Sequence, residues 1–252
     1  MPDFGGGYGP STYGDRIADV FDASFVPHDE HSAAGFLASV AGGGPALELG
    51  IGTGRVALPL RRLGIEVEGI EASSAMIDRL REKRGGKRIR VWTGDLADVD
   101  VGTDVRYPLI YVVFNTLFAL LTQDDQIRCF RNVATHLAPA GAFVIEAFVP
   151  DPSKFDDGQR TETFELTNDL VRLDVTRHEA DTQRIFGQHV VITERRVRLY
   201  PLAMRYAWPA EIDLMARLAR LRLRERWGGW HHEPFNSVSV SHVSVYERPR
   251  RR

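Results

Sequence analysis

Short apolar runs and helical apolar spacings alternate along residues 30 to 147. Strand-like segments, with apolar residues that alternate or run together, lie at 46–49, 66–70, 89–93, 109–114 and 142–147. Apolar positions three or four residues apart, typical of amphipathic helices, occur at 30–41, 55–63, 74–84 and 123–137. Because strands and helices follow one another in turn, the pattern predicts a parallel sheet with crossover helices. A further amphipathic helix is expected near the start, where Ile17, Val20, Phe21 and Phe25 have helical spacing.

This alternation ends after Pro150. Strand-like segments at 171–175, 185–193 and 197–199 then follow one another without helices between them. This part of the chain is therefore expected to form an antiparallel sheet with one face exposed. A helix is predicted after Pro209, and two further strands, LRLRERW at 221–227 and HVSVYER at 242–248, are expected to join the first sheet.

The first predicted strand of the parallel sheet runs into a glycine-rich turn, ALELGIGTGR at 46–55. Gly50, Gly52 and Gly54 occupy every second position where the strand gives way to a helix. Glycine tolerates positive φ and lets a ligand approach the backbone without meeting a Cβ atom. In doubly wound sheets such a turn builds a ligand site at the carboxyl ends of the strands. A tight turn without a ligand is the alternative.

The spacing within and after this turn indicates a nucleoside. A dinucleotide-binding turn has the pattern G-x-G-x-x-G/A, but Arg55 stands at the third glycine position. Glu71 ends the second strand, about 20 residues after the first glycine, where a carboxylate can accept hydrogen bonds from both ribose hydroxyls. Asp95, in the sequence Gly94-Asp95-Leu96 after the third strand, can accept a hydrogen bond from an exocyclic amine.

With these residues in place, the chain resembles the class I S-adenosylmethionine-dependent methyltransferases. The motifs that carry the resemblance are, in order, ELGIGTG, GIEASSAM, GDL, VVFNTLFALL and LAPAGAFVIEAF. The resemblance covers residues 13–150 and the last two strands, and Ile51 and Ala140 depart from residues common in the family. It implies S-adenosyl-L-methionine as the cofactor and S-adenosyl-L-homocysteine as its product.

The resemblance also implies cofactor contacts, residue by residue. The implied set is Tyr13, Glu48, Gly50, Gly52, Gly54, Glu71, Ala72, Met76, Gly94, Asp95, Leu96, Phe114 and Asn115. Within it, Glu71 is expected on the ribose and Asp95 on the adenine amine. Phe114 and Asn115 are expected to face the sulfonium, and Tyr13 the carboxylate or methyl region.

The implied fold class is α/β, a doubly wound, Rossmann-like sheet of seven strands with an antiparallel β insertion after the fifth strand. Residues 1–12, rich in glycine, are expected to form a flexible tail. Residues 13–150 are expected to form the cofactor-binding core with its N-terminal helices, and 151–208 the inserted sheet. The final helix and strands, within 209–252, would complete the core sheet.

The inserted segment carries the aromatic residues Phe164, Phe186, Tyr200, Tyr206 and Trp208. Its position is similar to that of the lid in small-molecule methyltransferases, including aminosugar N-methyltransferases of natural-product pathways. The resemblance therefore implies a small-molecule substrate beneath this sheet. A homodimer interface built from the same aromatic residues is the alternative, with or without a lid function.

Methyl transfer from a sulfonium depends mainly on positioning, and a general base assists when the nucleophile carries a proton. Glu146, at the end of the fifth strand, and His189, in the inserted sheet, are the candidate catalytic residues. The cluster His231-His232-Glu233 is a further candidate for the base. No metal site is expected in that cluster, because adjacent residues rarely converge on one ion.

Charge and composition argue against several partners. The formal net charge of −2 gives no overall attraction to nucleic acid or to an anionic membrane, and the arginines between Arg217 and Arg226 are typical of solvated element sides. No Asp-Pro-Pro-Tyr or Asn-Pro-Pro-Tyr motif of nucleic-acid methyltransferases follows the fourth strand. Cys129 is the single cysteine, no secretory leader begins the sequence, and no apolar run approaches the roughly 20 residues that span a bilayer. A cytoplasmic location is therefore expected.

The sequence thus predicts an enzyme that transfers a methyl group from S-adenosylmethionine to an oxygen, nitrogen or carbon nucleophile of a small molecule in secondary metabolism. Two alternatives stay open. One is a methyltransferase-fold protein that binds the cofactor for a non-methylating reaction. The other is an NAD-dependent dehydrogenase.

Overall fold

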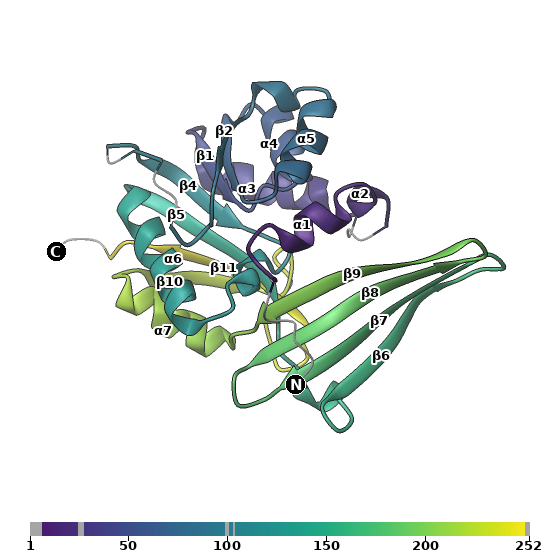
Figure 1. The fold of residues 1–252 in the computed structure, drawn as a ribbon. Helices are drawn as coiled ribbons and strands as arrows, with labels where there is room; N and C mark the ends of the chain where they lie inside the picture. Colours follow the sequence, from purple (N-terminus) through teal and green to yellow (C-terminus); the bar gives the residue numbers. More distant parts are fainter. Residues whose placement is uncertain (1–6, 25–27, 99–100, 103, 250–252) are drawn as a thin grey trace.

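The computed structural model describes residues 7–24, 28–98, 101–102 and 104–249. Seven strands form its central sheet, in the spatial order β10-β11-β5-β4-β1-β2-β3 (Figure 1). Their bounds are β1 Ala46–Leu49, β2 Val67–Glu71, β3 Arg90–Thr93, β4 Tyr107–Val112, β5 Leu137–Phe148, β10 Arg222–Trp227 and β11 Ser241–Glu247. Strands β1 to β5 are parallel, and β11 runs antiparallel between β5 and β10. The carboxyl ends of the five parallel strands therefore meet at one edge.

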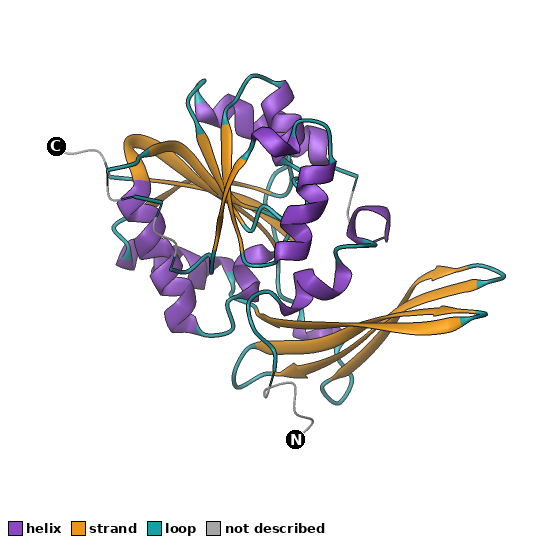
Figure 2. Ribbon diagram, turned by 45° about the horizontal axis from the view of Figure 1, so that its top comes forward, coloured by secondary structure: helices purple, strands orange, loops and turns teal. Residues whose placement is uncertain are grey.

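Helices cover both faces of the central sheet (Figure 2). Their bounds are α1 Thr12–Ile17, α2 Phe21–Ser24, α3 Glu30–Ala41, α4 Ala57–Arg62, α5 Ser74–Glu82, α6 Gln123–His136 and α7 Pro209–Leu218. One buried cluster joins α3 and α4 to the sheet through Leu37 and Leu60, and another joins α6 and α7 through Phe130 and Ile212. Burial on both faces explains why the central strand β4 is almost wholly apolar, whereas the edge strand β3 is only partly buried.

A second sheet follows β5 and projects from the central one (Figure 1). Its four antiparallel strands, in the order β6-β7-β8-β9, are β6 Gln159–Leu166, β7 Leu170–Glu179, β8 Arg184–Thr193 and β9 Arg196–Arg205. We call this sheet the lid. Together with the central sheet it confirms the predicted fold class, a seven-stranded Rossmann-like α/β sheet with an antiparallel insertion after the fifth strand.

The two faces of the lid have different environments, because successive side chains of a strand point to opposite faces. Asp174 and Thr176 of β7 and His189 of β8 line a large cavity between the lid and the core, whereas Val175 is exposed. Exposed apolar side chains at the far end of the lid include Leu166 and Val197. The homodimer expected through this sheet stays a prediction.

The lid rejoins the core through a buried polar network at the end of β9. Arg205, which is 6% exposed, donates hydrogen bonds to Gln126 Oε1 at 2.6 Å and Gln183 Oε1 at 2.9 Å, and it forms an ion pair with Glu211 at 2.7 Å. Gln126 in turn donates to the Arg205 carbonyl at 2.7 Å. These contacts join the last strand of the lid to α6 and α7.

Several observed elements differ from the predicted ones. The N-terminal helix is divided into α1 and α2, because Val20 N–H donates to the Ile17 carbonyl in a tight turn between them, and Phe25 lies outside the described residues. Strand β6 was not predicted, since its residues are mostly polar on both faces. Strand β5 begins at Leu137 rather than at Ala142.

The predicted flexible tail, residues 1–12, lies partly outside the described residues, which begin at Gly7. Tyr8 lines the cavity, and its hydroxyl accepts a hydrogen bond from Ala203 N–H of the lid at 3.1 Å. Helix α1 begins at Thr12 and contacts both α5 and β9. The first described residues are thus placed between the core and the lid (Figure 1).

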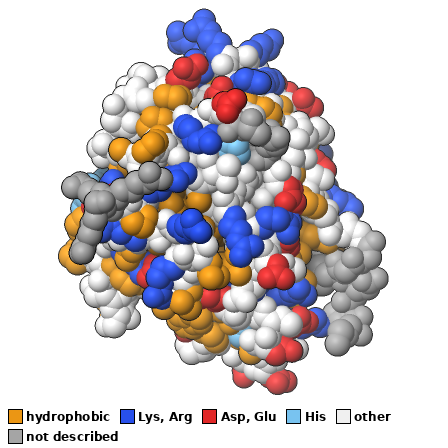
Figure 3. Space-filling model, turned by 90° about the vertical axis from the view of Figure 1, so that its left-hand side faces the viewer, with side chains coloured by type: hydrophobic (Ala, Val, Ile, Leu, Met, Phe, Trp, Pro, Cys, Tyr) orange, Lys and Arg blue, Asp and Glu red, His pale blue; other side chains and the backbone are white. Residues whose placement is uncertain are grey.

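The arginines near β10 are paired locally with acidic side chains. Arg222 pairs with Glu247 at 2.5 Å, and Arg226 pairs with Asp213 at 2.6 Å. On the face of the molecule drawn in Figure 3, basic side chains are interspersed with acidic and apolar ones. Among the described residues, no helix combines the length and the apolar character needed to cross a membrane.

Candidate active site

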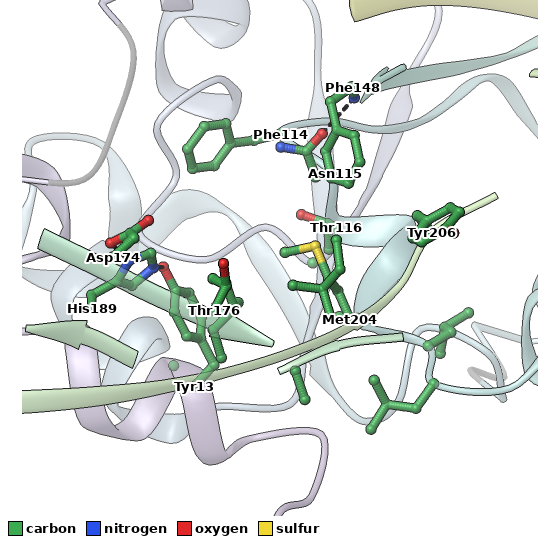
Figure 4. A pocket seen from close by; sticks show the side chains of 18 of the residues that line it. Tyr13, Phe114, Asn115, Thr116, Phe148, Asp174, Thr176, His189, Met204 and Tyr206 are labelled. Atoms are coloured by element: carbon green, nitrogen blue, oxygen red, sulfur yellow. Dashed lines mark hydrogen bonds and ion pairs between the residues drawn. The ribbon is translucent and has the colours of Figure 1, made fainter. Parts of the chain in front are cut away.

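A cavity of about 1000 Å³ lies between the carboxyl edge of the parallel strands and the inner face of the lid. All predicted cofactor-binding residues except Glu48 and Gly54 line it, namely Tyr13, Gly50, Gly52, Glu71, Ala72, Met76, Gly94, Asp95, Leu96, Phe114 and Asn115. Of the predicted catalytic residues, His189 lines the cavity and Glu146 does not. The structure therefore brings the predicted nucleoside-site residues and the lid histidine into one cavity, and Figure 4 shows His189 with Tyr13, Phe114 and Asn115.

The glycine-rich turn is shaped by backbone geometry and close packing. Gly50 has φ +70°, and a Cβ atom there would lie 2.4 Å from Thr116 Cγ2. Gly54 has φ +77°, and its Cβ atom would lie 2.4 Å from Leu80 Cδ1. Both positions therefore require glycine, because larger residues would be strained and would collide with their neighbours. Gly54 serves the packing of α5 against the turn rather than the cavity wall.

Glu71 is oriented by the backbone at the end of β2. Its two carboxylate oxygens accept hydrogen bonds from Gly52 N–H at 2.8 Å and from Ser73 N–H at 2.9 Å. Burial raises the pKa of this carboxyl above its usual range, and these backbone hydrogen bonds oppose the rise. A carboxylate has about four lone-pair sites, so both oxygens retain acceptor capacity toward the cavity.

Asp95 is held in a similar way after β3. One carboxylate oxygen accepts a hydrogen bond from Ala97 N–H at 2.8 Å, which fixes the side chain at the cavity wall. Met76, whose N–H is capped by the Ser73 hydroxyl, supplies an apolar surface near it, as does Leu96. Two carboxylates and an apolar wall therefore lie at neighbouring strand ends.

Glu48 lies behind this wall. Its side chain, 2% exposed, points to the α3 side of β1 and accepts a hydrogen bond from the Tyr111 hydroxyl at 3.0 Å. Burial raises the pKa of Glu48 to about 8, against the opposing effects of Tyr111 and Arg55. Glu48 thus contacts its own strand neighbours, not the cavity.

This raised pKa predicts a pH-dependent stability. The folded state keeps a proton on Glu48 that the unfolded chain loses above its ordinary pKa, so the free energy of unfolding falls as pH rises toward 8. Between pH 6 and pH 8 this group alone accounts for a loss of about 2 kcal/mol. Glu48→Gln should remove that part of the slope in urea unfolding measured at both pH values. The exposed control Glu66→Gln should keep it.

Phe114 and Asn115 follow β4 in an uncommon backbone conformation. Both have positive φ, 54° and 62°, which is costly for residues other than glycine. The Asn115 amide oxygen accepts a hydrogen bond from Phe148 N–H at 2.7 Å, and the Asn115 N–H donates to the Glu146 carbonyl at 3.3 Å. Strand β5 therefore holds these two residues at the cavity.

Glu146 contributes to this arrangement from outside the cavity. Its carboxylate accepts a hydrogen bond from Phe114 N–H, and burial raises its pKa to about 7. The Arg55 guanidinium lies 5.2 Å from the centre of the Phe114 ring and pairs with Asp29 at 2.5 Å. In this position Glu146 can orient Phe114, but it does not line the space that a substrate would enter.

His189 is placed differently, on the cavity face of the lid. Its Nδ1 lies 2.5 Å from Asp174 Oδ1, and its Nε2 lies 3.5 Å from the Tyr13 hydroxyl. Asp174 is opposite His189 in the register of β7 and β8, and both line the cavity (Figure 4). Asp174 was not predicted as a site residue, because its contact with His189 depends on the pairing register of β7 and β8.

The cavity also extends beyond the predicted residues. At another part of its wall, His178 Nε2 lies 2.9 Å from the Tyr206 hydroxyl, and the His178 ring stacks on Phe155 at 4.8 Å. Side chains alternate along β7, so His178 lies on the same face as Asp174. This alternation is the sequence feature that could have identified His178 as a cavity residue. The aromatic residues Tyr206 and Phe148 appear with Met204 in Figure 4.

The other histidine cluster lies away from the cavity lining. The His232 ring contacts Phe36 of α3 at 5.0 Å and Trp227 at 4.9 Å, and Glu233 accepts a hydrogen bond from His231 N–H. Within the part of the chain that the structure describes, no group of three or more potential metal ligands is found.

Comparison with known proteins agrees with this geometry. Residues 46–141 match the family of the methyltransferase domain. The solved structure of the CcbJ methyltransferase from Streptomyces caelestis is 41% identical, with a TM-score of 0.92 over 96% of this chain and 100% of that one. The sugar N-methyltransferase KedS8 from Streptoalloteichus sp has the same fold, with a TM-score of 0.69 at 18% identity over 96% of each chain.

A curated relative extends the comparison over nearly the full length. The cypemycin N-terminal methyltransferase of Streptomyces sp is 29% identical over 248 residues, which span 95% of this chain and 98% of the relative. The chain therefore belongs to the class I S-adenosylmethionine-dependent methyltransferase family.

Proposed function

We propose that this protein transfers a methyl group from S-adenosylmethionine to a nitrogen, oxygen or carbon nucleophile of a small molecule in natural-product biosynthesis. The observation that carries the proposal is the single cavity that joins Glu71 and Asp95 at the strand ends to His189 beneath the lid. The N-methyltransferases among the relatives, named for cypemycin and for sugars, support the reaction class.

The residues of the strand edge fit this cofactor. Gly52 has no atom within 4 Å of where its Cβ would be, so its backbone adjoins open space beside Glu71. Glu71 would hold the ribose hydroxyls, and Asp95 would accept from the adenine amine, with Met76 against the ring. When bound, the cofactor supplies an electrophilic methyl group on a sulfonium.

The remaining tasks belong to the chain itself. Phe114 and Asn115 shape the wall at the end of β4, and we propose that they face the methyl group. The inserted segment, residues 151–208, which contains the lid, would cover the acceptor and exclude water, with apolar contacts from Ile185, Leu202 and Met204. His189 is favoured over Glu146 as the general base, because it alone of the two lines the cavity.

A non-methylating role for the same cofactor site is the second candidate. It shares the strand-edge residues and would differ only at the lid. A dehydrogenase is disfavoured, because Arg55 pairs with Asp29 at the position where dinucleotide-binding turns place their third glycine.

Mass spectrometry separates the two surviving candidates. The protein is incubated with S-adenosylmethionine carrying a deuterated methyl group and with a small-molecule extract of its producing cells. Methyl transfer predicts a new product that carries the label and the accumulation of S-adenosylhomocysteine. Binding of the cofactor without any labelled product would favour the non-methylating role.

The cofactor assignment predicts a specific loss of affinity. Glu71→Ala should weaken S-adenosylhomocysteine binding about 10- to 100-fold in titration calorimetry, because the ribose hydroxyls and Gly52 N–H lose their acceptor. The exposed acidic residue Asp78, on α5, provides the matched control, and Asp78→Ala should leave the affinity unchanged. Equal affinities of Glu71→Ala and wild type would refute the ribose assignment.

A further inference from the structure

A carboxylate, an imidazole and a phenol form a chain across the roof of the cavity. Asp174 Oδ1 lies 2.5 Å from His189 Nδ1, and His189 Nε2 lies 3.5 Å from the Tyr13 hydroxyl. Asp174 and His189 come from the neighbouring strands β7 and β8, Tyr13 comes from α1 near the start of the chain, and all three line the cavity. Figure 4 shows them together at one side of it.

The direction of the hydrogen bonds follows from the groups present. An ionised carboxylate only accepts, so the proton between Asp174 and His189 resides on Nδ1. Nε2 of the neutral ring is then an acceptor, and the Tyr13 hydroxyl donates to it. Burial raises the pKa of Tyr13 well above its usual value, which keeps this hydroxyl protonated and able to donate.

We propose that Asp174 is the positioning residue that fixes this tautomer, so that His189 Nε2 accepts the proton of an N–H or O–H nucleophile, which displaces the Tyr13 hydroxyl. This proposal rests on the proposed function and narrows it to a nucleophile that carries a proton. The Tyr13 contact, at 3.5 Å, is long for a hydrogen bond and is therefore readily exchanged for a closer donor.

Other groups around His189 fit this role. Tyr200 of β9 is its register partner on the side opposite Asp174, and Tyr13 approaches from α1. Arg172 of β7, two positions from Asp174 on the same face, pairs with Glu165 at 2.8 Å. Tyr8 lies near Tyr13 in the same wall. Asp174 is thus in direct contact with the ring, and its side chain is 23% exposed.

The step that follows is balanced. The acceptor proton moves to His189 Nε2, the acceptor lone pair forms the bond to the methyl carbon, and the S–C bond breaks with its electron pair left on sulfur. The products are the methylated acceptor, S-adenosylhomocysteine and an imidazolium stabilised by Asp174. A carbon nucleophile without an acidic proton would make no use of this chain.

Nitrogen-15 NMR of the histidine rings in the S-adenosylhomocysteine-loaded protein tests the proposal. His189 signals are assigned by their loss in His189→Gln. The wild type should show the neutral His189 ring protonated on Nδ1. Asp174→Asn should shift it to the Nε2-protonated form, as an amide can donate to Nδ1. The matched control Glu162→Gln, opposite Asp174 on β6, should leave the tautomer unchanged.

The outcomes are distinct for the two proposals. A wild-type ring protonated on Nε2, or an unchanged tautomer in Asp174→Asn, would overturn the inference, and the wild-type spectrum decides even if that variant fails to fold. With the acceptor found by mass spectrometry, Asp174→Asn should lower kcat by about 10-fold or more with KM unchanged. Absence of S-adenosylhomocysteine binding would instead overturn the proposed function. The His189 tautomer could still be measured in the protein without bound S-adenosylhomocysteine.

Discussion

Exchange of His189 for glutamine is expected to lower kcat for methyl transfer by about 10²- to 10⁴-fold, the range over which a positioned general base contributes. The imidazole lines the cavity and is oriented by Asp174, whereas a glutamine side chain cannot take up a proton at neutral pH. The rate is measured with the acceptor that yields a labelled product. The affinity for S-adenosylhomocysteine should not change, since Glu71 and Asp95 are intact.

An exposed histidine provides the control for this exchange. His31 lies on α3, outside the cavity lining, and His31→Gln should turn over like the wild type. A His189→Gln variant with wild-type kcat would show that proton removal is not part of the rate-limiting chemistry. Glu146→Gln should be compared with His189→Gln, because Glu146 is expected to orient Phe114 and not to act as the base.

Loss of Arg205 is expected to destabilise the protein by about 3 to 5 kcal/mol, the cost of removing one partner of a buried ion pair. Its guanidinium donates to Glu211, Gln126 and Gln183, and Arg205→Ala would leave the buried Gln126 Oε1 without this donor and Glu211 with the amide donors Gln123 and Gln183 alone. The free energy of unfolding is measured by urea titration. A large decrease is expected because β9, α6 and α7 all depend on this contact.

The loss of stability depends on how far the ion pair is exposed to solvent, and Arg222 provides a matched comparison with Arg205. Arg222 forms a similar ion pair with Glu247, but its side chain is 53% exposed. Arg222→Ala should therefore cost less than about 1 kcal/mol. Equal costs for the two variants would contradict the role assigned to the Arg205 network.

The core of the fold was predictable because its physical signals are local. Strand β1 is short and buried along its whole length, with three apolar residues out of four. Helix α3 spans the predicted residues, 30–41, and ends at Gly42 in the left-handed conformation. The glycine spacing and Glu71 indicated the candidate nucleoside site for a similar reason. The glycine turn begins directly after β1 and Glu71 is the last residue of β2, and parallel strand ends meet at one edge.

The lid side of the site was less predictable, because it depends on strand register and on contacts between separate elements. Asp174 and His189 meet only through the register of β7 and β8, and Tyr13 reaches them from α1. Strand β6 carries polar residues on both faces, so it has no period-two signal. The left-handed backbone of Phe114 and Asn115 is held by β5, and nothing in VVFNTL by itself indicates it.

The role of Glu146 illustrates the same limit. Its position at the end of β5 suggested a catalytic carboxylate near the cofactor. Its side chain bonds instead to Phe114 N–H, on the side of Arg55 and Asp29, whose positions come from tertiary packing. A strand end therefore predicts the edge at which a side chain lies, whereas its partners depend on the packed fold.

Titration calorimetry of the wild-type protein with S-adenosylhomocysteine and, separately, with NAD is the most direct measurement of the central claim. Binding of a nucleoside by Glu71 and Asp95 beside the glycine turn predicts one-site, micromolar-range binding of S-adenosylhomocysteine and no heat from NAD. Heat from NAD with none from S-adenosylhomocysteine would contradict it.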